Sequence, residues 1–477
     1  MAGRDQAPLP GGLKDSGCGG EDSFLQALDR CIAAAGKGFA IGAGLRGGLV
    51  IFAVMARLRK ASLLLRSSGG RIADKHLVRN ALKETLRYGF FVGAFAGVYT
   101  SVDELVASLV GFGRSARWRS LVAGAIAGPS LLLTGPKTRH TSMALYILMR
   151  AAVLAARCGV KSKKVGWLFS PVSWKHGDVL LMCLSSSQIL SAWILKPDTL
   201  PSSYVSFLNK HGGKDMSVVR GIRELALREP LTSLAKIQEH YRDNGTEIQL
   251  DPTMKVPCTM IHANQLCLIH FLQFIGDAYV RSVMVYLPVY LGPAVVVHRQ
   301  GLLKRPFTIL TKSLLGTARS SLFLATYCAS AWGWTCLLFR LLNGCNPATL
   351  ALGTFPTGLA LTIEKKSRRM EIALYCFSRA LESLGLCITS SAAFQPHHHR
   401  LPKRTDVVLF SFATSIIMHC YARERDVFRS KYLNVLDWVF GVPRSDDPVQ
   451  RSVDKKRNRA QKTKEDGDDD ERANSAA

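Results

Sequence analysis

The chain lacks the short motifs that identify the common classes of enzyme. It contains no nucleophile elbow, no phosphate-binding P-loop, no dinucleotide-binding fingerprint and no HExxH helix. Each of these motifs sets a nucleophile, a ligand or a row of backbone donors where a reaction needs it. Enzymatic activity therefore has no support in the sequence, and we predict a protein that is not an enzyme and uses no cofactor.

Acidic residues are scarce relative to basic ones, because 35 Asp and Glu stand against 62 Lys and Arg, giving a formal net charge of +27. The basic residues gather between apolar segments, as in RLRKASLLLRSSGGRIADKHLVR (57–79) and KSKKVGW (161–167). Nucleic-acid binding would need a basic soluble module, and none is evident, so we expect no nucleic-acid partner. Basic residues beside apolar segments are typical of membrane proteins, where they contact anionic lipid headgroups.

Long apolar blocks are abundant, and about 20 helical residues cross the hydrocarbon core of a bilayer. The blocks lie at residues 31–56, 88–111, 120–135, 141–156, 178–195, 267–297, 314–339, 348–363, 370–388 and 405–421. Together they predict an all-α polytopic membrane protein with about eight to ten transmembrane helices.

The sequence contains an internal duplication. ALYILMRAA (144–152) matches ALYCFSRAL (373–381), and this alignment pairs Arg150 with Arg379. An alignment shifted by a single position pairs Asp178, Asp198, Tyr204 and Gly213 with Asp406, Asp426, Tyr432 and Gly441. Two homologous membrane repeats are implied, and duplicated membrane units are a common plan of transporters.

The duplication divides the chain into five segments. We predict a first membrane repeat over residues 31–213, a soluble amphipathic linker over 214–257 and a second membrane repeat over 258–441. Residues 1–30 and the charged tail 442–477 are expected to be disordered. Five spans per repeat would make the repeats inverted and four would make them parallel; the short, serine-rich block 178–195 leaves both open.

Glycines recur at four-residue spacing in the first repeat, as in RYGFFVGAFAGVY (87–99). A glycine inside a water-soluble helix costs about 1 kcal/mol relative to alanine. In lipid, small residues at this spacing let two helix backbones approach closely. We predict helix packing, with a pore lining as the alternative, at Gly38, Gly42, Gly44, Gly48, Gly89, Gly93, Gly97, Gly124 and Gly128.

Ionisable residues inside apolar blocks are candidate functional residues, because a charge in the bilayer is costly unless it is paired or hydrated. They are Arg46, Arg150, Asp277, Arg281 and Arg379. Asp277 and Arg281 are four residues apart and could neutralise each other on one helix face. Arg150 and Arg379 form either a symmetric site for an anionic ligand or a shared pair of interfacial anchors.

One short stretch has metal-ligand character. CTMIHANQLCLIH (258–270) presents Cys258, His262, Cys267 and His270 in an order that could supply two thiolates and two imidazoles to zinc. The spacing fits no common zinc module, and the alternative is that these are ordinary residues at a helix boundary.

Several of these stretches carry a family likeness. IEKKSRRMEIALYCFSRALESLG (363–385), preceded by YLPVYLGPAVVV (286–297) and by Cys258 and Cys267, resembles the N-terminal cysteine-rich half of the transmembrane protein 135 family, also called peroxisomal membrane protein 52. GFFVGAFAGVYTSVDELV (89–106) and HGDVLLMCLSSSQILSAWILKPDTLPSSYVSFL (176–208) resemble its C-terminal half, so the halves stand in the opposite order. The glycine-rich first repeat is also similar, more weakly, to the four-helix fold of mitochondrial inner-membrane translocases.

The resemblance implies an integral protein of peroxisomal or mitochondrial membranes that supports lipid homeostasis and organelle dynamics. Its implied partners are membrane lipids and other organelle membrane proteins, and it supplies no catalytic residue. The alternative function is a solute transporter or translocation channel built from the two repeats, which the duplication, the glycines and the intramembrane arginines favour.

Overall fold

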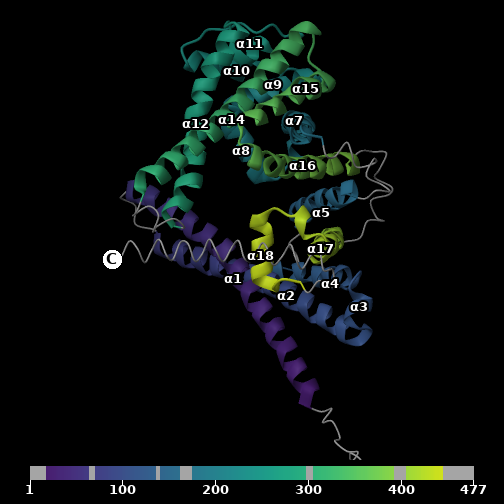
Figure 1. The fold of residues 1–477 in the computed structure, drawn as a ribbon. Helices are drawn as coiled ribbons and strands as arrows, with labels where there is room; N and C mark the ends of the chain where they lie inside the picture. The colour runs from purple at the N-terminus through teal and green to yellow at the C-terminus, as the bar shows by residue number, and fades with distance from the viewer. Residues whose placement is uncertain are drawn as a thin grey trace, which may run out of the picture. The chain divides into compact units, whose positions relative to one another are not determined.

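In the part of the chain that it describes, the computed structural model is built from helices (Figure 1). It describes residues 18–63, 70–135, 140–161, 174–296, 305–390 and 404–443. Six helices in these ranges are long and apolar enough to cross a membrane: Arg79–Val110, Thr141–Lys161, Gly177–Leu195, Pro306–Leu341, Lys366–Thr389 and Thr405–Arg423. The predicted all-α polytopic fold is confirmed. Of the two termini predicted to be disordered, residues 1–17 and 444–477 lie outside the described residues. Residues 18–30 are helical, because they form the start of α1, which corrects that part of the prediction.

The same series of elements occurs twice along the chain. The first copy is α1 (Cys18–Leu63), α2 (Gly70–Val110), α4 (Arg119–Ala127), η1 (Gly128–Thr134), α5 (Thr141–Lys161), α7 (Gly177–Leu195), η3 (Pro197–Thr199) and α8 (Ser202–Gly212). The second is α12 (Cys267–Val296), α14 (Pro306–Leu341), α15 (Pro347–Thr354), η4 (Phe355–Ile363), α16 (Lys366–Thr389), α17 (Thr405–Arg423), η6 (Arg425–Val427) and α18 (Ser430–Phe440). The short α3 (Phe112–Ser115) occurs in the first copy, and α9 (Met216–Leu227), α10 (Leu234–Asp243) and α11 (Cys258–His262) lie between the copies.

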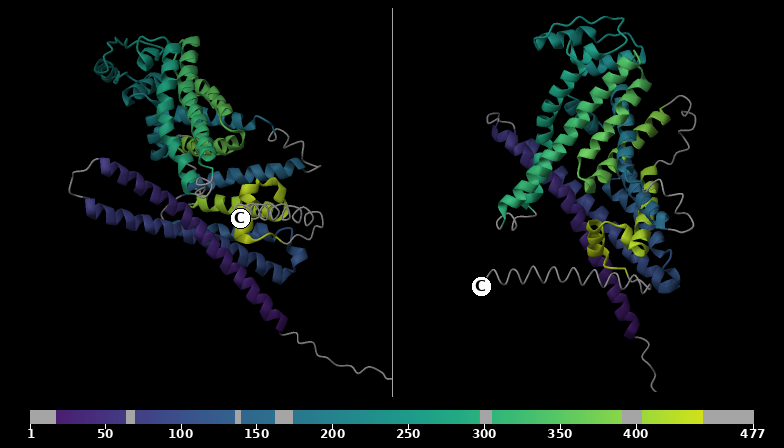
Figure 2. Two further views of the ribbon diagram at one scale, coloured as in Figure 1. Left: turned by 60° about the vertical axis from the view of Figure 1, so that its left-hand side comes forward. Right: turned by 45° about the horizontal axis from the view of Figure 1, so that its top comes forward.

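Two compact units are present, and each contains helices from both copies. Unit 1 comprises Met1–His140, Ala151–Cys158 and Asp406–Ala477, and unit 2 comprises Thr141–Arg150 and Gly159–Thr405. Unit 1 therefore includes α17 and α18 of the second copy, which lie among α2 and α4 in Figures 1 and 2. Unit 2 includes α7 of the first copy, which packs against α15, η4 and α16. The copies exchange their last helices.

The two exchanged helices make equivalent contacts. In unit 1, a Cβ atom added to Gly128 would collide with Ser411 of α17. In unit 2, a Cβ atom added to Gly358 would come within 2.5 Å of the Cα atom of Cys183 on α7. Ser411 and Cys183 are themselves equivalent positions in the alignment that pairs Asp178 with Asp406. Each unit thus uses a glycine to bring the exchanged helix against backbone.

Two of the predicted spans are corrected by the structure. Blocks 120–135 and 348–363 are shorter apolar helices, Arg119–Thr134 and Pro347–Ile363, in which an α-helix continues as a 3₁₀ segment. A proline stands at the start of each 3₁₀ segment, Pro129 in η1 and Pro356 in η4. Proline has no amide hydrogen and crowds the preceding turn, so it interrupts the α-helical pattern.

The glycines of α1 and α2 divide into two groups. A Cβ atom on Gly38 would lie 2.7 Å from the Val92 carbonyl oxygen, and Gly93 is similarly close to α1. Gly42, Gly89 and Gly97 also face the neighbouring helix, while Gly124 faces α17. Gly44 and Gly48 have no atom within 4 Å of an added Cβ atom, so the predicted packing role does not extend to them.

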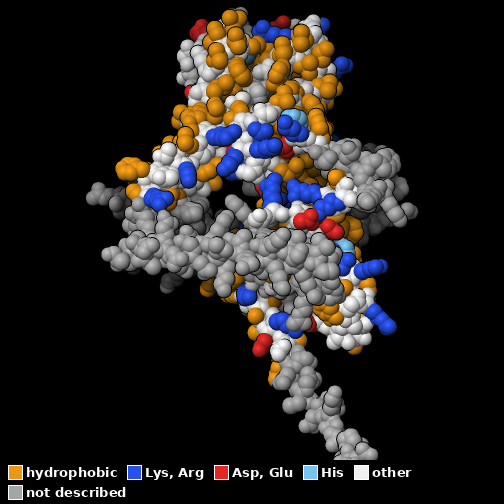
Figure 3. Space-filling model, viewed as in Figure 1, with side chains coloured by type: hydrophobic (Ala, Val, Ile, Leu, Met, Phe, Trp, Pro, Cys, Tyr) orange, Lys and Arg blue, Asp and Glu red, His pale blue; other side chains and the backbone are white. Residues whose placement is uncertain are grey.

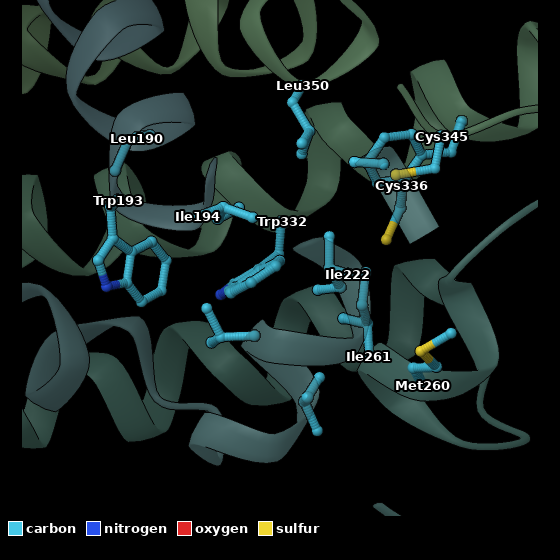
Figure 4. Packing of buried hydrophobic residues seen from close by; sticks show 14 of the residues in the cluster. Leu190, Trp193, Ile194, Ile222, Met260, Ile261, Trp332, Cys336, Cys345 and Leu350 are labelled. Atoms are coloured by element: carbon cyan, nitrogen blue, oxygen red, sulfur yellow. The ribbon is translucent and has the colours of Figure 1, made fainter. Parts of the chain in front are cut away.

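Unit 2 holds the larger hydrophobic core. Trp193 of α7 and Trp332 of α14 lie edge to face with ring centroids 6.2 Å apart, and Figure 4 shows them adjacent. The same core takes in Ile222 of α9 and Ile261 of α11. The segment between the repeats thus includes the amphipathic helices α9 and α10 and is anchored through its apolar side chains.

Unit 2 also exposes a large apolar surface. Hydrophobic side chains cover much of its visible face in Figure 3. Along α12 the exposed residues Leu268, Leu272, Val280 and Met284 form an apolar face that winds around the helix, because each step of four residues completes slightly more than one turn. A face of this kind suits contact with lipid, because water would penalise so much exposed apolar area.

Candidate metal centre and charged sites

Three cysteines and one histidine converge at one point of unit 2. They are Cys258 and His262 of α11, Cys267 at the start of α12, and Cys336 of α14. Their possible ligand atoms all lie within 4.8 Å of one another. Cys258, His262 and Cys336 are buried and Cys267 is half-buried, so the cluster lies inside the protein.

The local chain path explains how three of these residues meet. Cys258 and His262 are four residues apart on α11, so they share one helix face. Ala263 then adopts the positive φ of 53°, which is uncommon for a residue other than glycine and turns the chain sharply. The turn brings Cys267 back, so that its Sγ atom lies 3.2 Å from Nε2 of His262.

The fourth member differs from the prediction. His270 does not join the set; its ring stacks on His262 with centroids 5.4 Å apart. Cys336, from a helix far along the chain, takes the fourth place. No local spacing could reveal it, and its only signal is its position near the end of the apolar block 314–339.

The surroundings favour a thiolate in the cluster. Cys336, His262 and the Arg340 guanidinium surround Cys258 and hold the pKa of its thiol well below its usual range, although burial acts in the opposite direction. The thiolate is the form of cysteine that binds metal ions. Three sulfur donors with one imidazole nitrogen are a ligand set of closed structural zinc sites.

Arg150 and Arg379 occupy equivalent places on α5 and α16. The Arg150 guanidinium lies over the Tyr146 ring and donates to Glu371, with 3.1 Å between Nη1 and Oε1. Arg379 lies over Tyr375 and donates to Glu382. Glu382 also accepts from Ser142, with 2.6 Å between the oxygens.

These contacts are related by the duplication. The alignment that pairs Arg150 with Arg379 also pairs Ser142 with Glu371. Arg150 contacts Glu371 directly. The equivalent positions, Arg379 and Ser142, are linked indirectly, because both donate hydrogen bonds to Glu382. Of the four predicted intramembrane arginines, the repeat-equivalent Arg150 and Arg379 are thus paired with carboxylates of α16.

The other predicted charges have different surroundings. Arg46 pairs with Glu84 and lies over the Tyr88 ring. Asp277 is exposed and makes no ion pair with Arg281 in the described part of the chain, which corrects the predicted pairing. Arg281 instead lies over the Phe274 ring, a cation–π contact that holds it away from Asp277.

Arg281 lies beside two further basic groups. Burial, together with the Arg281 charge, lowers the pKa of Lys214 to about 8. Burial likewise lowers the pKa of His211 to about 4, with Lys210 and Arg281 adding to the effect. The charge of Arg281 thus disfavours the protonated forms of both of these neighbours.

A charged cavity in unit 1 was not predicted. Its volume is about 430 Å³, and its wall includes Asp103 and Glu104 of α2 and Arg119 of α4. The Arg119 guanidinium is buried, with 3.1 Å between its Nε and Oδ1 of Asp103, while Arg30 pairs with Glu104. Asp103 and Glu104 stand in the apolar block 88–111, where an ionisable residue could have marked the site.

The counterpart of this cavity in unit 2 is nearly filled. The alignment that pairs Asp178 with Asp406 also pairs Tyr99 with Tyr327, Glu104 with Trp332 and Trp193 with Tyr421. In unit 2 these positions line an apolar cavity of only about 40 Å³. The two copies have diverged at the same place, one into a charged cavity and the other into a tryptophan-filled core.

Comparison with known proteins finds one family to which part of the chain is similar. Residues 259–387 match the family model described as the N-terminal cysteine-rich region of Transmembrane protein 135. This region includes His262, Cys267 and Cys336, and begins one residue after Cys258. No curated protein and no solved structure matches the chain. The resemblance of this region to the N-terminal cysteine-rich half of the family is confirmed, while the resemblance of 89–106 and 176–208 to its C-terminal half stays a prediction.

Proposed function

We propose that this chain, a membrane protein of the transmembrane protein 135 family, supports lipid homeostasis and organelle dynamics in peroxisomal or mitochondrial membranes. The main support for the proposal is the matched cysteine-rich region, which lies within a series of apolar helices. The proposed role is non-enzymatic. Membrane lipids and organelle membrane proteins are its proposed partners, and the exposed apolar face of α12 supports lipid contact.

The location of the protein tests this proposal. The full-length chain, tagged after residue 477, is expressed in cells and compared with peroxisomal and mitochondrial markers. We expect residence in one or both organelles. Residence confined to the endoplasmic reticulum or the plasma membrane would contradict the proposed organelle role.

Solute transport is the second candidate, and a specific feature favours it. Short, proline-interrupted apolar segments in corresponding positions of two repeats are typical of transporter binding sites. Here α4–η1 and α15–η4 are such a pair, and α4 contributes Arg119 to the charged cavity. A buried ion pair beside an open cavity can offer both charges to a polar solute.

Access to the cavity from the two sides of the membrane tests transport without knowledge of the solute. Thr100 lines the charged cavity, and its repeat counterpart is the native Cys328 in the filled one. In a transporter, the Thr100→Cys variant reacts with a membrane-impermeant thiol reagent applied from either side, because the cavity opens alternately. Labelling from one side alone would contradict transport, and Cys328 serves as the unreactive internal control.

A further inference from the structure

We propose that Cys258, His262, Cys267 and Cys336 bind one Zn²⁺ ion, which fastens α11 and the adjoining helices α9 and α10 to α14. The site joins three separate elements of unit 2. It uses three of the four residues predicted from sequence and replaces His270 by Cys336.

The spacing of the four side chains fits a tetrahedral ion. Zinc binds sulfur at about 2.3 Å and imidazole nitrogen at about 2.0–2.1 Å, which places tetrahedral sulfur ligands roughly 3.8 Å apart. The ligand atoms here lie within 4.8 Å of one another, so shifts of about 1 Å close the site. A cluster formed by packing alone would not need all four donor atoms to meet at one point.

The histidine distinguishes this cluster from a patch of buried thiols. Cysteine packs well as a small apolar residue and needs no partner. The imidazole of His262 is only 4% exposed, and its Nδ1 atom has no hydrogen-bond partner among the described residues. Its other nitrogen, Nε2, faces only the weakly hydrogen-bonding thiol of Cys267. Burial of so poorly paired an imidazole is costly, and a bond from Nε2 to a metal ion would offset part of that cost.

The charge of the filled site has a local counterion. Three thiolates and one Zn²⁺ ion leave one net negative charge. Arg340 stands one helical turn after Cys336 on α14, and its guanidinium faces Cys258. The site therefore carries the positive neighbour that a buried anionic centre needs.

Zinc content of the purified full-length protein tests the site. We expect about one zinc per chain, falling about tenfold or more in Cys258→Ser and in Cys336→Ser. Cys328→Ser and Cys345→Ser, which change cysteines of the same unit outside the cluster, should retain the metal. His270→Asn should also retain it, because His270 only stacks on the ligand His262.

Metal exchange in the wild-type protein keeps the test independent of misfolded variants. After chelation, α9–α11 should exchange amide hydrogens faster, and added Zn²⁺ should restore their protection. Added Co²⁺ should produce the intense absorption of a tetrahedral thiolate site. The proposal is overturned by a protein without bound zinc, by zinc that survives both cysteine variants, or by a Cys258–Cys336 disulfide in freshly purified protein.

Discussion

At the residue scale, Gly42 and Gly44 on α1 share a sequence pattern but differ in surroundings. A Cβ atom on Gly42 would press on the Tyr88 backbone, whereas one on Gly44 meets nothing within 4 Å. We expect Gly42→Ala to destabilise the protein by about 1–3 kcal/mol through overpacking. Gly44→Ala should be neutral or stabilising by up to about 1 kcal/mol, because alanine favours helix.

Thermal unfolding in detergent measures both glycine variants against wild type. Equal effects of the two substitutions would contradict the close approach of α1 and α2. Sequence spacing alone cannot separate the two glycines, because Gly-xxx-Gly pairs on different faces of one helix look the same in the sequence.

Glu224 on α9, which is not among the six candidate membrane-spanning helices, predicts a pH dependence of stability. Burial alone would raise the pKa of its carboxyl, but hydrogen bonds from Thr232 and Ser233 outweigh this and lower it. The stabilisation is therefore present above the usual glutamate pKa and is lost as the pH falls through the lowered value. We expect α9 and α10 to lose amide protection on acidification.

The Glu224→Gln variant is the control for this pH dependence. In this variant the amides of α9 and α10 should be less protected at neutral pH. Their protection should also change less on acidification, because residue 224 then has no carboxylate to protonate. Hydrogen exchange, corrected for its intrinsic pH dependence, measures both proteins. Identical pH profiles would show that Glu224 does not contribute.

The metal cluster shows how far residue-level prediction reaches. Cys258, His262 and Cys267 lie close together in the sequence, so their spacing alone makes them candidates. Cys336 enters through helix packing, which no local pattern records. His270 was a reasonable candidate by spacing, but the structure uses its ring for stacking instead.

At the element scale, the pairing of α5 with α16 explains the two repeat-equivalent arginines. Arg150 and Glu371 have side chains that are 21% and 24% exposed, so their pair is largely shielded. We expect Arg150→Glu to destabilise the protein by about 2 kcal/mol, between the effects known for exposed and buried pairs. Adding Glu371→Arg should restore most of the loss.

The exposed pair of Arg46 and Glu84 provides the matched control for this charge reversal. Its side chains are 36% and 48% exposed, so Arg46→Glu should cost about 1 kcal/mol or less. Unfolding of the three variants in detergent gives the comparison. Failure of the double variant to recover would show that Arg150 serves another partner, such as an anionic ligand.

The two apolar helices that continue as 3₁₀ segments show that hydropathy alone overestimates the length of regular helix. Blocks 120–135 and 348–363 are apolar enough to look like spans, yet each contains a proline that begins a 3₁₀ segment. The prolines were visible in the sequence and mark the interruption. The apolar composition was correctly recognised, while the length of regular helix was overestimated.

At the scale of the whole molecule, the sequence predicts the duplication but does not predict the exchange of helices between the two copies. A constant offset pairs α7 with α17 without saying which copy each helix packs against. The exchanged helices offer similar surfaces, since Cys183 and Ser411 stand at equivalent glycine contacts. Because the surfaces of α7 and α17 are so similar, the sequence does not indicate which copy each of these helices packs against.

The most direct test of the exchanged arrangement uses two native cysteines. Cys158 of α5 and Cys420 of α17 come from different copies, and their sulfur atoms lie 3.8 Å apart in unit 1. Mild oxidation of the full-length protein in its membrane should link them within one chain, as read by mass spectrometry, and Cys158→Ser should abolish the link. Absence of this link, or its formation only between two chains, would contradict the exchange of helices.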